Sequence, residues 1–263
     1  MKKRFIFISI LIILAFAMIY NYSNLTYASP IEFIDNQDKI DGGIGYSSNW
    51  AGYIAIKKDS NGFPISDSVS YIKGSWTVPE VDCSLVKNGN TFIWVGIDGY
   101  LSSTIEQIGT SSKCVNGNPE YSGWYEFYPQ YAIFIPSFTV SPGDNITAEV
   151  RYLPKKEKFR LTITNDNTGE KFSVTRKSNN AQRSSAEWII EAPKESDNIV
   201  PLSDFGEVTF RNAEVKIKGK MGKIESETWA NRQIDMFYQN GLKANTSSLS
   251  ESGDSFSVTW LHE

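Results

Sequence analysis

The ten residues SSAEWIIEAP, Ser184–Pro193, have the alternation of a β-strand. Successive side chains of a strand point to opposite faces of its sheet. One face of this strand is then large and apolar, and it consists of Ala186, Trp188 and Ile190. This pattern predicts a strand that packs against a hydrophobic core.

The opposite face of the same strand carries Glu187, beside Ile189 and Glu191. A carboxylate flanked by bulky side chains is partly withdrawn from water, which raises its pKa and suits acid and base chemistry. The alternative is an ordinary glutamate on a solvated outer face. The strand alone does not distinguish these two interpretations.

Short strand-like segments recur along the rest of the chain, bounded by Gly, Asn and Pro. They are residues 49–53, 70–78, 91–98, 104–108, 123–128, 146–152, 159–163, 171–175, 204–215 and 255–260. After the segment 104–108 we expect a polar loop that contains Cys114 and Gly117. The pattern of residues 221–240 is mixed and is compatible with one or two helical turns. Short strands at regular spacing predict an antiparallel sandwich or barrel. We expect one all-β domain over residues 49–263.

The N-terminus has the three-part pattern of a secretory signal peptide. A basic start is followed by the apolar run Phe5–Tyr20 and by Thr26-Tyr27-Ala28, a small-residue cleavage site before Ser29. The apolar run is short for a membrane span, which needs about 20 residues. We expect residues 1–28 to be removed, residues 29–48 to be a leader or pro-segment, and the protein to be secreted. Retention at the cell surface by an uncleaved anchor is the alternative.

Charge and cysteine content narrow the classes of partner. Loss of residues 1–28 removes three positive charges and no negative ones, so the formal net charge moves from −4 to −7. An acidic protein without a basic cluster is a poor candidate for binding nucleic acid or an anionic membrane. The two cysteines, Cys83 and Cys114, fit an oxidising compartment where they can bridge. A metal site is disfavoured because the only histidine is His262, next to the C-terminus.

Several catalytic mechanisms lack their residues in this sequence. A Ser-His-Asp or Cys-His site needs an imidazole base, and a lone terminal histidine is a poor one. The chain has no HExxH zinc motif, no glycine-rich phosphate loop and no DTG or DSG pair for an aspartic dyad. An enzyme with this sequence must use a carboxylate, a tyrosine or a lysine as its acid or base.

A set of aromatic and polar side chains shares strands whose other faces are apolar: Trp94, Asp98, Gln107, Trp124, Glu126, Tyr128 and Glu187. One face of a sandwich sheet is often concave, and such a set would line a groove for an extended glycan or peptide. The alternative places Trp94 and Trp124 in the core and leaves the polar residues on an ordinary wet face.

Five blocks of sequence, in this order, resemble the eqolisin family of glutamic peptidases. They are WVGIDG (Trp94–Gly99), EQIGT (Glu106–Thr110), WYEFYP (Trp124–Pro129), SSAEWIIEAP (Ser184–Pro193) and DFGEVTF (Asp204–Phe210). The similarity runs from about Asn49 to the C-terminus and is closer to a bacterial branch than to the fungal one.

The resemblance implies a lectin-like jelly roll of two packed antiparallel sheets. It also implies endopeptidase activity at acidic pH on polypeptide substrates, without a metal or cofactor; we further expect a monomer. The family's catalytic glutamine and glutamate fall on Gln107 and Glu187. Its cleft-lining side chains fall on Trp94, Asp98 and Glu126, with Trp124 beside them, and these are the expected substrate-binding residues.

The chain departs from the fungal pattern near the expected cleft. Ser122-Gly123 stands where fungal members have an extra aspartate, and the apolar AIFIP follows Tyr131 where they carry acid. Fewer neighbouring carboxylates mean a smaller upward shift in the pKa of the catalytic one, and hence a less extreme pH optimum. The fungal cysteine pattern is also not matched, so the pairing of Cys83 with Cys114 rests on their being the only two.

In the expected mechanism, Glu187 takes a proton from a water molecule that attacks the scissile carbonyl, and Gln107 donates to the developing oxyanion. Two other functions remain open at this point. One is a lectin-like glycoside hydrolase with Glu126 and Glu187 as its carboxylates. The other is a non-catalytic carbohydrate- or peptide-binding module that stacks its ligand on Trp94 and Trp124.

Overall fold

The computed structural model describes residues 26–34, 43–238 and 241–263, and these residues form an almost entirely β structure. The only described helix is the 3₁₀ turn Pro154–Lys156. None of the described helices is long and apolar enough to cross a membrane. The apolar run Phe5–Tyr20 lies outside the described residues.

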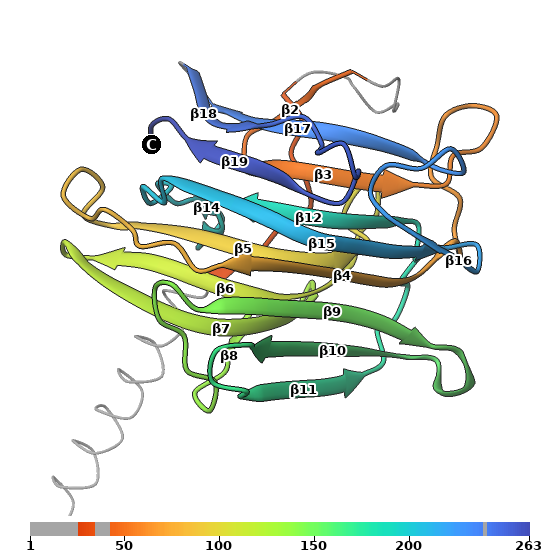
Figure 1. Ribbon diagram of the computed structural model, residues 1–263, viewed down its shortest axis with the longest axis horizontal. Helices are drawn as coiled ribbons and strands as arrows, with labels where there is room; N and C mark the ends of the chain where they lie inside the picture. Colours follow the sequence, from red (N-terminus) through yellow and green to blue (C-terminus); the bar gives the residue numbers. More distant parts are fainter. Residues whose placement is uncertain (1–25, 35–42, 239–240) are drawn as a thin grey trace, which may run out of the picture.

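The strands form the expected two-sheet antiparallel sandwich (Figure 1). The first sheet has the order β8 (Ile133–Phe134), β7 (Asn118–Tyr128), β6 (Ile105–Val115), β5 (Gly89–Ile97), β12 (Ser185–Glu191), β3 (Trp50–Ile56), β17 (Ala230–Tyr238), β18 (Gly241–Thr246) and β19 (Phe256–Trp260). The second has the order β15 (Glu207–Ile217), β4 (Val69–Thr77), β9 (Asn145–Leu153), β10 (Lys158–Asn165) and β11 (Lys171–Arg176).

Strand β15 joins the two sheets. Its first part, Glu207 to Phe210, pairs with β19, and its later part pairs with β4. The register shifts between Arg211 and Glu214, and Asn212 between them has a φ of 53°. A bulge of this kind bends a strand and increases its twist, which lets one strand serve both sheets. Five further short strands are described. β16 (Lys220–Gly222) pairs with β15, and β2 (Gly45–Ser47) is parallel to β17. The other three form a small separate sheet in which β13 (Lys194–Glu195) pairs with both β1 (Thr26–Tyr27) and β14 (Asn198–Ile199).

The main core lies between the two sheets. The apolar face predicted for the strand at 184–193 points into it, with Ala186, Trp188 and Ile190 fully buried. The indole nitrogen of Trp188 donates to the Lys73 carbonyl of the facing sheet at 2.8 Å. Burial of a large aromatic side chain contributes on the order of 2–3 kcal/mol. This pattern therefore fixes the other face of β12, with Glu187, as the outer face of the first sheet.

Two local expectations were wrong. Residues 221–240 contain no helical turn among those described, because β16 and β17 occupy this stretch. The polar loop expected around Cys114 is instead a hairpin in which β6 and β7 continue to the two-residue turn Asn116-Gly117. Both turn residues have positive φ, 50° and 81°, which is the geometry that Asn-Gly favours in tight hairpins. Cys114 thus lies in β6, where it forms a disulfide with Cys83.

The described parts of the expected leader, residues 29–48, pack against the sandwich together with the last three residues of the expected signal peptide. Residues 45–47 form β2 on the edge of β17, and residues 26–34 lie against the outer face of the first sheet. Ala28, Ile31 and Phe33 join a second apolar cluster there with Trp50, Trp94 and Trp124. The outer face that the sequence predicts as an open groove is thus covered by the chain's own N-terminal segment.

Candidate active site

Glu187 and Gln107 lie in one cross-strand row of the first sheet. In register, Glu187 of β12 pairs with Gly96 of β5, Gly96 pairs with Gln107 of β6, and Gln107 pairs with Glu126 of β7. Directly opposed residues of antiparallel strands point to the same face. Strands are spaced about 4.8 Å apart, so the backbones of Glu187 and Gln107 are about 10 Å apart. The predicted acid and amide therefore share one face, with one strand between them.

Gly96 is the residue between them, and it contributes no side chain to the row. A Cβ at this position would lie 2.8 Å from the Trp94 ring and 3.2 Å from Cβ of Gln107. A glycine inside a strand weakens the strand and often marks a close approach of a ligand. The row thus has no side chain between the acid and the amide, and the Trp94 ring and the Gln107 side chain pack closely over the glycine. Gly96 lies in the WVGIDG block of the sequence, where it was given no role of its own.

The carboxyl group of Glu187 is fully buried. Neither of its oxygens makes a hydrogen bond of ordinary geometry to the described residues. Burial raises its pKa well above the usual range, the Ser185 hydroxyl and the Tyr100 backbone oppose this shift, and the charges of Asp98 and Glu106 add to it. A carboxyl group with a raised pKa holds its proton into weakly acidic solution and can both give and take it there.

Gln107 is oriented by Glu126. Nε2 of Gln107 donates to Oε2 of Glu126 at 2.8 Å, while Oε1 of the amide has no partner among the described residues. Glu126 is fully buried, and burial raises its pKa well above the usual range, with a further contribution from the charge of Glu191. The hydrogen bonds from Gln107 and from the Ala28 backbone partly oppose this shift.

Asp98 holds the start of the strand that carries Glu187. Its carboxylate accepts the backbone N–H groups of Arg183 and Ser184 at 2.7 and 2.9 Å, and the Ser184 hydroxyl at 3.0 Å. Burial raises the pKa of Asp98, and these hydrogen bonds oppose the rise. The contacts of Asp98 are therefore to the backbone just before β12.

The two predicted tryptophans occupy the neighbouring row, where Trp94 and Trp124 both face Gly109. Both are fully buried in the second apolar cluster. Trp94 packs edge-on against Trp50 with centroids 5.0 Å apart, and Trp124 stacks on Phe92 at 4.2 Å. In the uncut chain their surfaces are covered rather than open to a ligand.

The structure adds a residue that the sequence analysis left without a role. Glu191 is fully buried on the same outer face, and its Oε2 accepts the indole N–H of Trp94 at 2.9 Å. Its Oε1 accepts the backbone N–H of Ser29 at 2.8 Å. The alternation of the strand at 184–193 already puts Glu191 on the face of Glu187, and that was the available signal.

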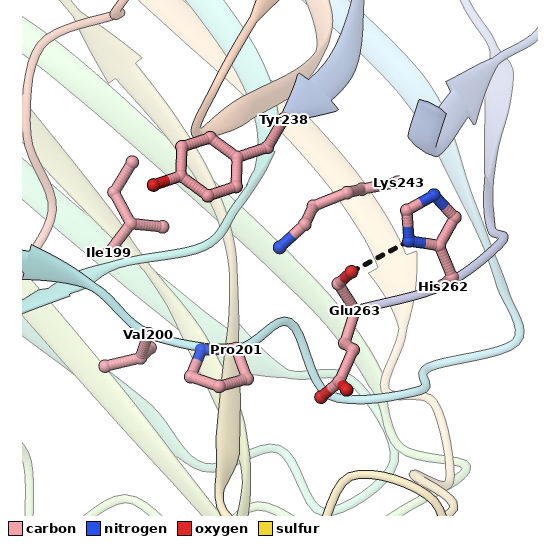
Figure 2. Close-up of a pocket in the computed structure, with 7 residues that line it drawn as sticks. All are labelled: Ile199, Val200, Pro201, Tyr238, Lys243, His262 and Glu263. Carbon is pink, nitrogen blue, oxygen red and sulfur yellow. Dashed lines mark hydrogen bonds between the residues drawn. The ribbon is translucent and has the colours of Figure 1, made fainter. Parts of the chain in front are cut away.

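A separate hollow of about 420 Å³ lies near the C-terminus, away from this row (Figure 2). Its lining includes Tyr238, Lys243 and His262. Nδ1 of the His262 imidazole lies 2.8 Å from the carbonyl oxygen of Glu263. Within the described residues, no group of three or more His, Cys, Asp or Glu side chains could hold a metal ion. The row from Glu187 to Glu126 is therefore the better candidate for an acid-base site.

Comparison with known proteins identifies the family. A sequence profile of the Peptidase A4 family matches residues 48–260. Aspergillopepsin-2 from Aspergillus niger is 31% identical over 239 residues, which cover 82% of this chain and 78% of that protein. Scytalidopepsin B from Scytalidium lignicola is 30% identical over 189 residues, which cover 68% of this chain and 67% of that protein.

Solved structures agree with the sequence matches. Scytalido-glutamic peptidase in complex with a transition state analog inhibitor aligns with a TM-score of 0.68 at 26% identity, over 81% of this chain and 98% of that one. Aspergilloglutamic peptidase from Aspergillus niger aligns with a TM-score of 0.58 at 32% identity, over 65% of this chain and 99% of that one. The chain therefore belongs to the Peptidase A4 family, the eqolisins, and is a glutamic endopeptidase.

Proposed function

We propose that the protein is exported and hydrolyses polypeptides at acidic pH, with Gln107 and Glu187 as the catalytic pair. The observation that carries the proposal is the row Glu187, Gly96, Gln107, which sets an acid and an amide on one face with only a glycine between them. In the proposed reaction a water molecule and a peptide carbonyl meet between these two side chains.

The proposed reaction needs one proton to move twice. Ionised Glu187 accepts a proton from water as the water oxygen attacks the scissile carbonyl carbon. The Gln107 amide donates a hydrogen bond to the carbonyl oxygen, and this bond strengthens as the oxygen becomes negative. The C–N bond then breaks while Glu187 gives its proton to the leaving nitrogen.

The acidic optimum follows from the surroundings of Glu187. Burial raises its pKa well above the usual range, and the charges of Asp98 and Glu106 raise it further. A residue that acts first as base and then as acid works best near its own pKa. Because Ser122-Gly123 lacks an additional acid, we propose a moderately acidic optimum.

We assign the other predicted residues supporting roles in the same reaction. Trp94 and Trp124 form an apolar floor for substrate side chains once the outer face is uncovered. Glu126 orients the Gln107 amide, which is supported by the 2.8 Å bond between them. The hydrogen bonds of Asp98 to residues 183 and 184 favour a positioning role for it rather than direct contact with substrate.

Export and a monomeric state complete the proposal. The expected signal peptide, residues 1–28, lies mostly outside the described residues. The Cys83–Cys114 disulfide fits an oxidising compartment and so supports export. The two related proteins named above are fungal peptidases of the same family, and no partner is needed to complete the row.

The glycoside hydrolase alternative is less well supported. Glu126 and Glu187 lie three strands apart in register, so their backbones are about 14 Å apart. A retaining pair needs its carboxyl groups about 5–5.5 Å apart. Gln107, which stands between them and bonds Glu126, would also have no role in glycoside cleavage.

The test uses the exported protein, denatured casein and a panel of β-glucans between pH 3 and 7. We expect casein cleavage with an acidic optimum and no glucan cleavage. Glu187→Gln should lower casein cleavage by at least about a thousandfold. Glu120→Gln, an exposed glutamate of the same sheet, is the matched control and should keep full activity. Casein cleavage by Glu187→Gln at the control's rate would overturn the assignment, and glucan cleavage would favour the alternative.

A further inference from the structure

Ser29 forms a hydrogen bond through each of its polar groups. Its backbone N–H donates to Oε1 of Glu191 at 2.8 Å, and its carbonyl oxygen accepts the indole N–H of Trp50 at 3.0 Å. Its hydroxyl oxygen accepts a hydrogen bond from Nδ2 of Asn49 at 3.1 Å. Ser29 is only 3% exposed. Each polar group of this residue is thus matched by a side chain of the sandwich.

Glu191 is the residue that receives the Ser29 nitrogen. It is fully buried, and its second oxygen accepts Trp94 Nε1 at 2.9 Å. The nearest cation that affects it is Lys194, whose ammonium group forms its ion pair with Glu32. A buried carboxyl group with only neutral donors against its oxygens lacks the partner that would stabilise its charge.

The sequence places a cut at the same position. Thr26 and Ala28 are the small residues of the predicted export cleavage site, and Ser29 follows them. Hydrolysis of the Ala28–Ser29 bond by an export peptidase consumes one water molecule. Its hydroxyl joins the Ala28 carbonyl carbon, and its proton joins the Ser29 nitrogen, which becomes a protonated α-amine below a pH of about 7.7.

We propose that Ser29 is the N-terminal residue of the mature protein and that its α-ammonium group binds the buried Glu191 carboxylate. The cut converts a neutral donor into a cation at the atom that already lies 2.8 Å from Glu191. The pair then resembles other buried ion pairs, which are stable when both partners keep further hydrogen bonds. Trp94 supplies one such bond to Glu191, and the space left by Ala28 admits water to the remaining N–H groups of Ser29.

The order of events follows from burial. Ala28 is fully buried and Ser29 nearly so, so a protease cannot reach their bond in the folded chain. The cut must precede folding, as cleavage during export does. The α-ammonium group is then present when the sandwich forms, and it can pair with Glu191 as the N-terminal segment packs against the sheet.

The same cut uncovers one end of the catalytic row. In the uncut chain the Ala28 N–H donates a hydrogen bond to Oε2 of Glu126 at 3.1 Å. The same oxygen accepts the hydrogen bond from Gln107. Thr26 and Tyr27 pair with β13, and their side chains donate to Glu195 and Asp197. Removal of residues up to Ala28 therefore frees Glu126 on one side while Ser29 stays anchored on the other.

The first experiment determines the N-terminus of the exported protein by mass spectrometry. We expect Ser29, and a different first residue would overturn the proposal. This inference rests on the proposed export but not on the peptidase reaction, so it is also tested on the inactive Glu187→Gln protein. If the unsubstituted protein begins at Ser29 but does not cleave casein, the result contradicts the proposed reaction and leaves this inference intact.

The second experiment is a double-mutant cycle on thermal unfolding. Two forms, released from a cleavable carrier so that they begin at Ser29 or at Thr26, each carry Glu191 or the Glu191→Gln substitution. Loss of one partner of a buried ion pair is strongly destabilising, and we expect Glu191→Gln to lower the Tm by about 5–10 °C more in the Ser29 form than in the Thr26 form. Glu120→Gln should shift both forms equally. An equal effect of Glu191→Gln on the two forms would overturn the ion pair.

A third measurement covers the case in which Glu191→Gln does not fold. An amine-acylating reagent is applied at pH 7 to the native Ser29 form and to the same protein in urea, and the N-terminal peptide is followed by mass spectrometry. A buried, paired ammonium group should react at least about tenfold more slowly in the native protein. Reaction at the unfolded rate shows a solvated amine and contradicts the proposal.

Discussion

Gln107 donates its side-chain amide to Glu126 across the β6–β7 ladder, with 2.8 Å between Nε2 and Oε2. An amide side chain rotates freely about its last bond unless a partner fixes it. Of the two ends of the Gln107 amide, the NH₂ group is the one that donates to Glu126, so this contact determines which atoms of the amide face the row. Both side chains are fully buried, so the bond is not in competition with bulk water.

Glu126→Ala should lower kcat with little change in KM, because it removes the group that orients the Gln107 amide. A misplacement of about 1 Å at a catalytic group can cost about a hundredfold in rate. Glu126→Gln retains an acceptor oxygen and should recover most of the loss. Steady-state kinetics on a fluorogenic peptide measure both. An equal loss in the two variants would mean that the negative charge, and not the orientation, is what matters.

Gln107→Ala should lower kcat by about two to three powers of ten, which is the usual cost of losing an oxyanion donor. The fold should persist, because β6 keeps its ladder with β5 and β7 on both sides. The exposed Gln130→Ala is the control of the same residue type. Circular dichroism with peptide kinetics separates the two effects. Full activity of Gln107→Ala would remove this residue from the mechanism.

Gly96→Ala should abolish activity, because the added Cβ would displace the Trp94 ring and the Gln107 side chain that pack over the glycine. That atom would lie 2.8 Å from the Trp94 ring, and relief of such a contact costs about 1–3 kcal/mol. Gly143→Ala is the control: it has open space but a φ of 85°, so it should lose about 1 kcal/mol and keep activity. Unfolding in urea and peptide cleavage are measured together. An active Gly96→Ala protein would show that the reaction does not occur between Glu187 and Gln107.

The sandwich could be predicted from the sequence because the strand pattern is strong where one face is buried. Trp188 and the residues at 186 and 190 are apolar and recur at every second position, which is the pattern of a strand with one face in the core. The same spacing assigns Glu187 to the outer face. The stretch 221–240 was harder to interpret, because Arg232 and Asp235 are buried polar residues that break the alternation of β17.

The covering of the outer face could not be predicted in this way. A strand pattern tells which side chains share a face, but it does not tell what lies on that face. The positions of Trp94 and Trp124 are compatible both with the lining of an open groove and with a buried cluster. In the uncut chain they are buried, because the segment that carries Ala28 packs over them. The pairing of Ser29 with Glu191 joins residues 162 positions apart, and no local pattern contains it.

Replacement of Cys83 and Cys114 by serine should destabilise the protein without affecting catalysis. The bridge closes a loop with a sequence separation of 31, and the loss of such a constraint on the unfolded chain costs roughly 3–4 kcal/mol. The disulfide joins Cys83, in the loop after β4, to Cys114 near the end of β6. Gln107 lies near the other end of β6, so the bridge is remote from the catalytic pair. Urea unfolding measures the loss, and peptide cleavage below the transition should be unchanged. A loss of activity in the folded variant would instead tie the loop to the site.

The protein should be more stable in acid than at neutral pH. Burial raises the pKa values of Glu106, Glu126 and Glu187 well above the usual range in the folded state, whereas an unfolded glutamate has a pKa of about 4.3. Above pH 4.3 the folded protein therefore binds more protons than the unfolded chain, so the free energy of unfolding falls as pH rises. The loss continues until pH passes the raised folded values. Calorimetry from pH 4 to pH 8 should show a falling Tm.

Glu106→Gln tests the origin of that slope at a group outside the proposed reaction. The carboxyl oxygens of Glu106 make no hydrogen bond of ordinary geometry to the described residues, and burial is the main cause of its raised pKa. Glutamine cannot ionise, so the substitution removes up to about 1.4 kcal/mol per pH unit from the slope of the free energy of unfolding against pH. The Tm should therefore rise at pH 7.5 and change little at pH 4. Glu120→Gln, which is exposed, should leave the slope unchanged. A Tm that stays flat or rises from pH 4 to pH 7.5 in the unmodified protein would contradict the burial of these acids in their neutral form.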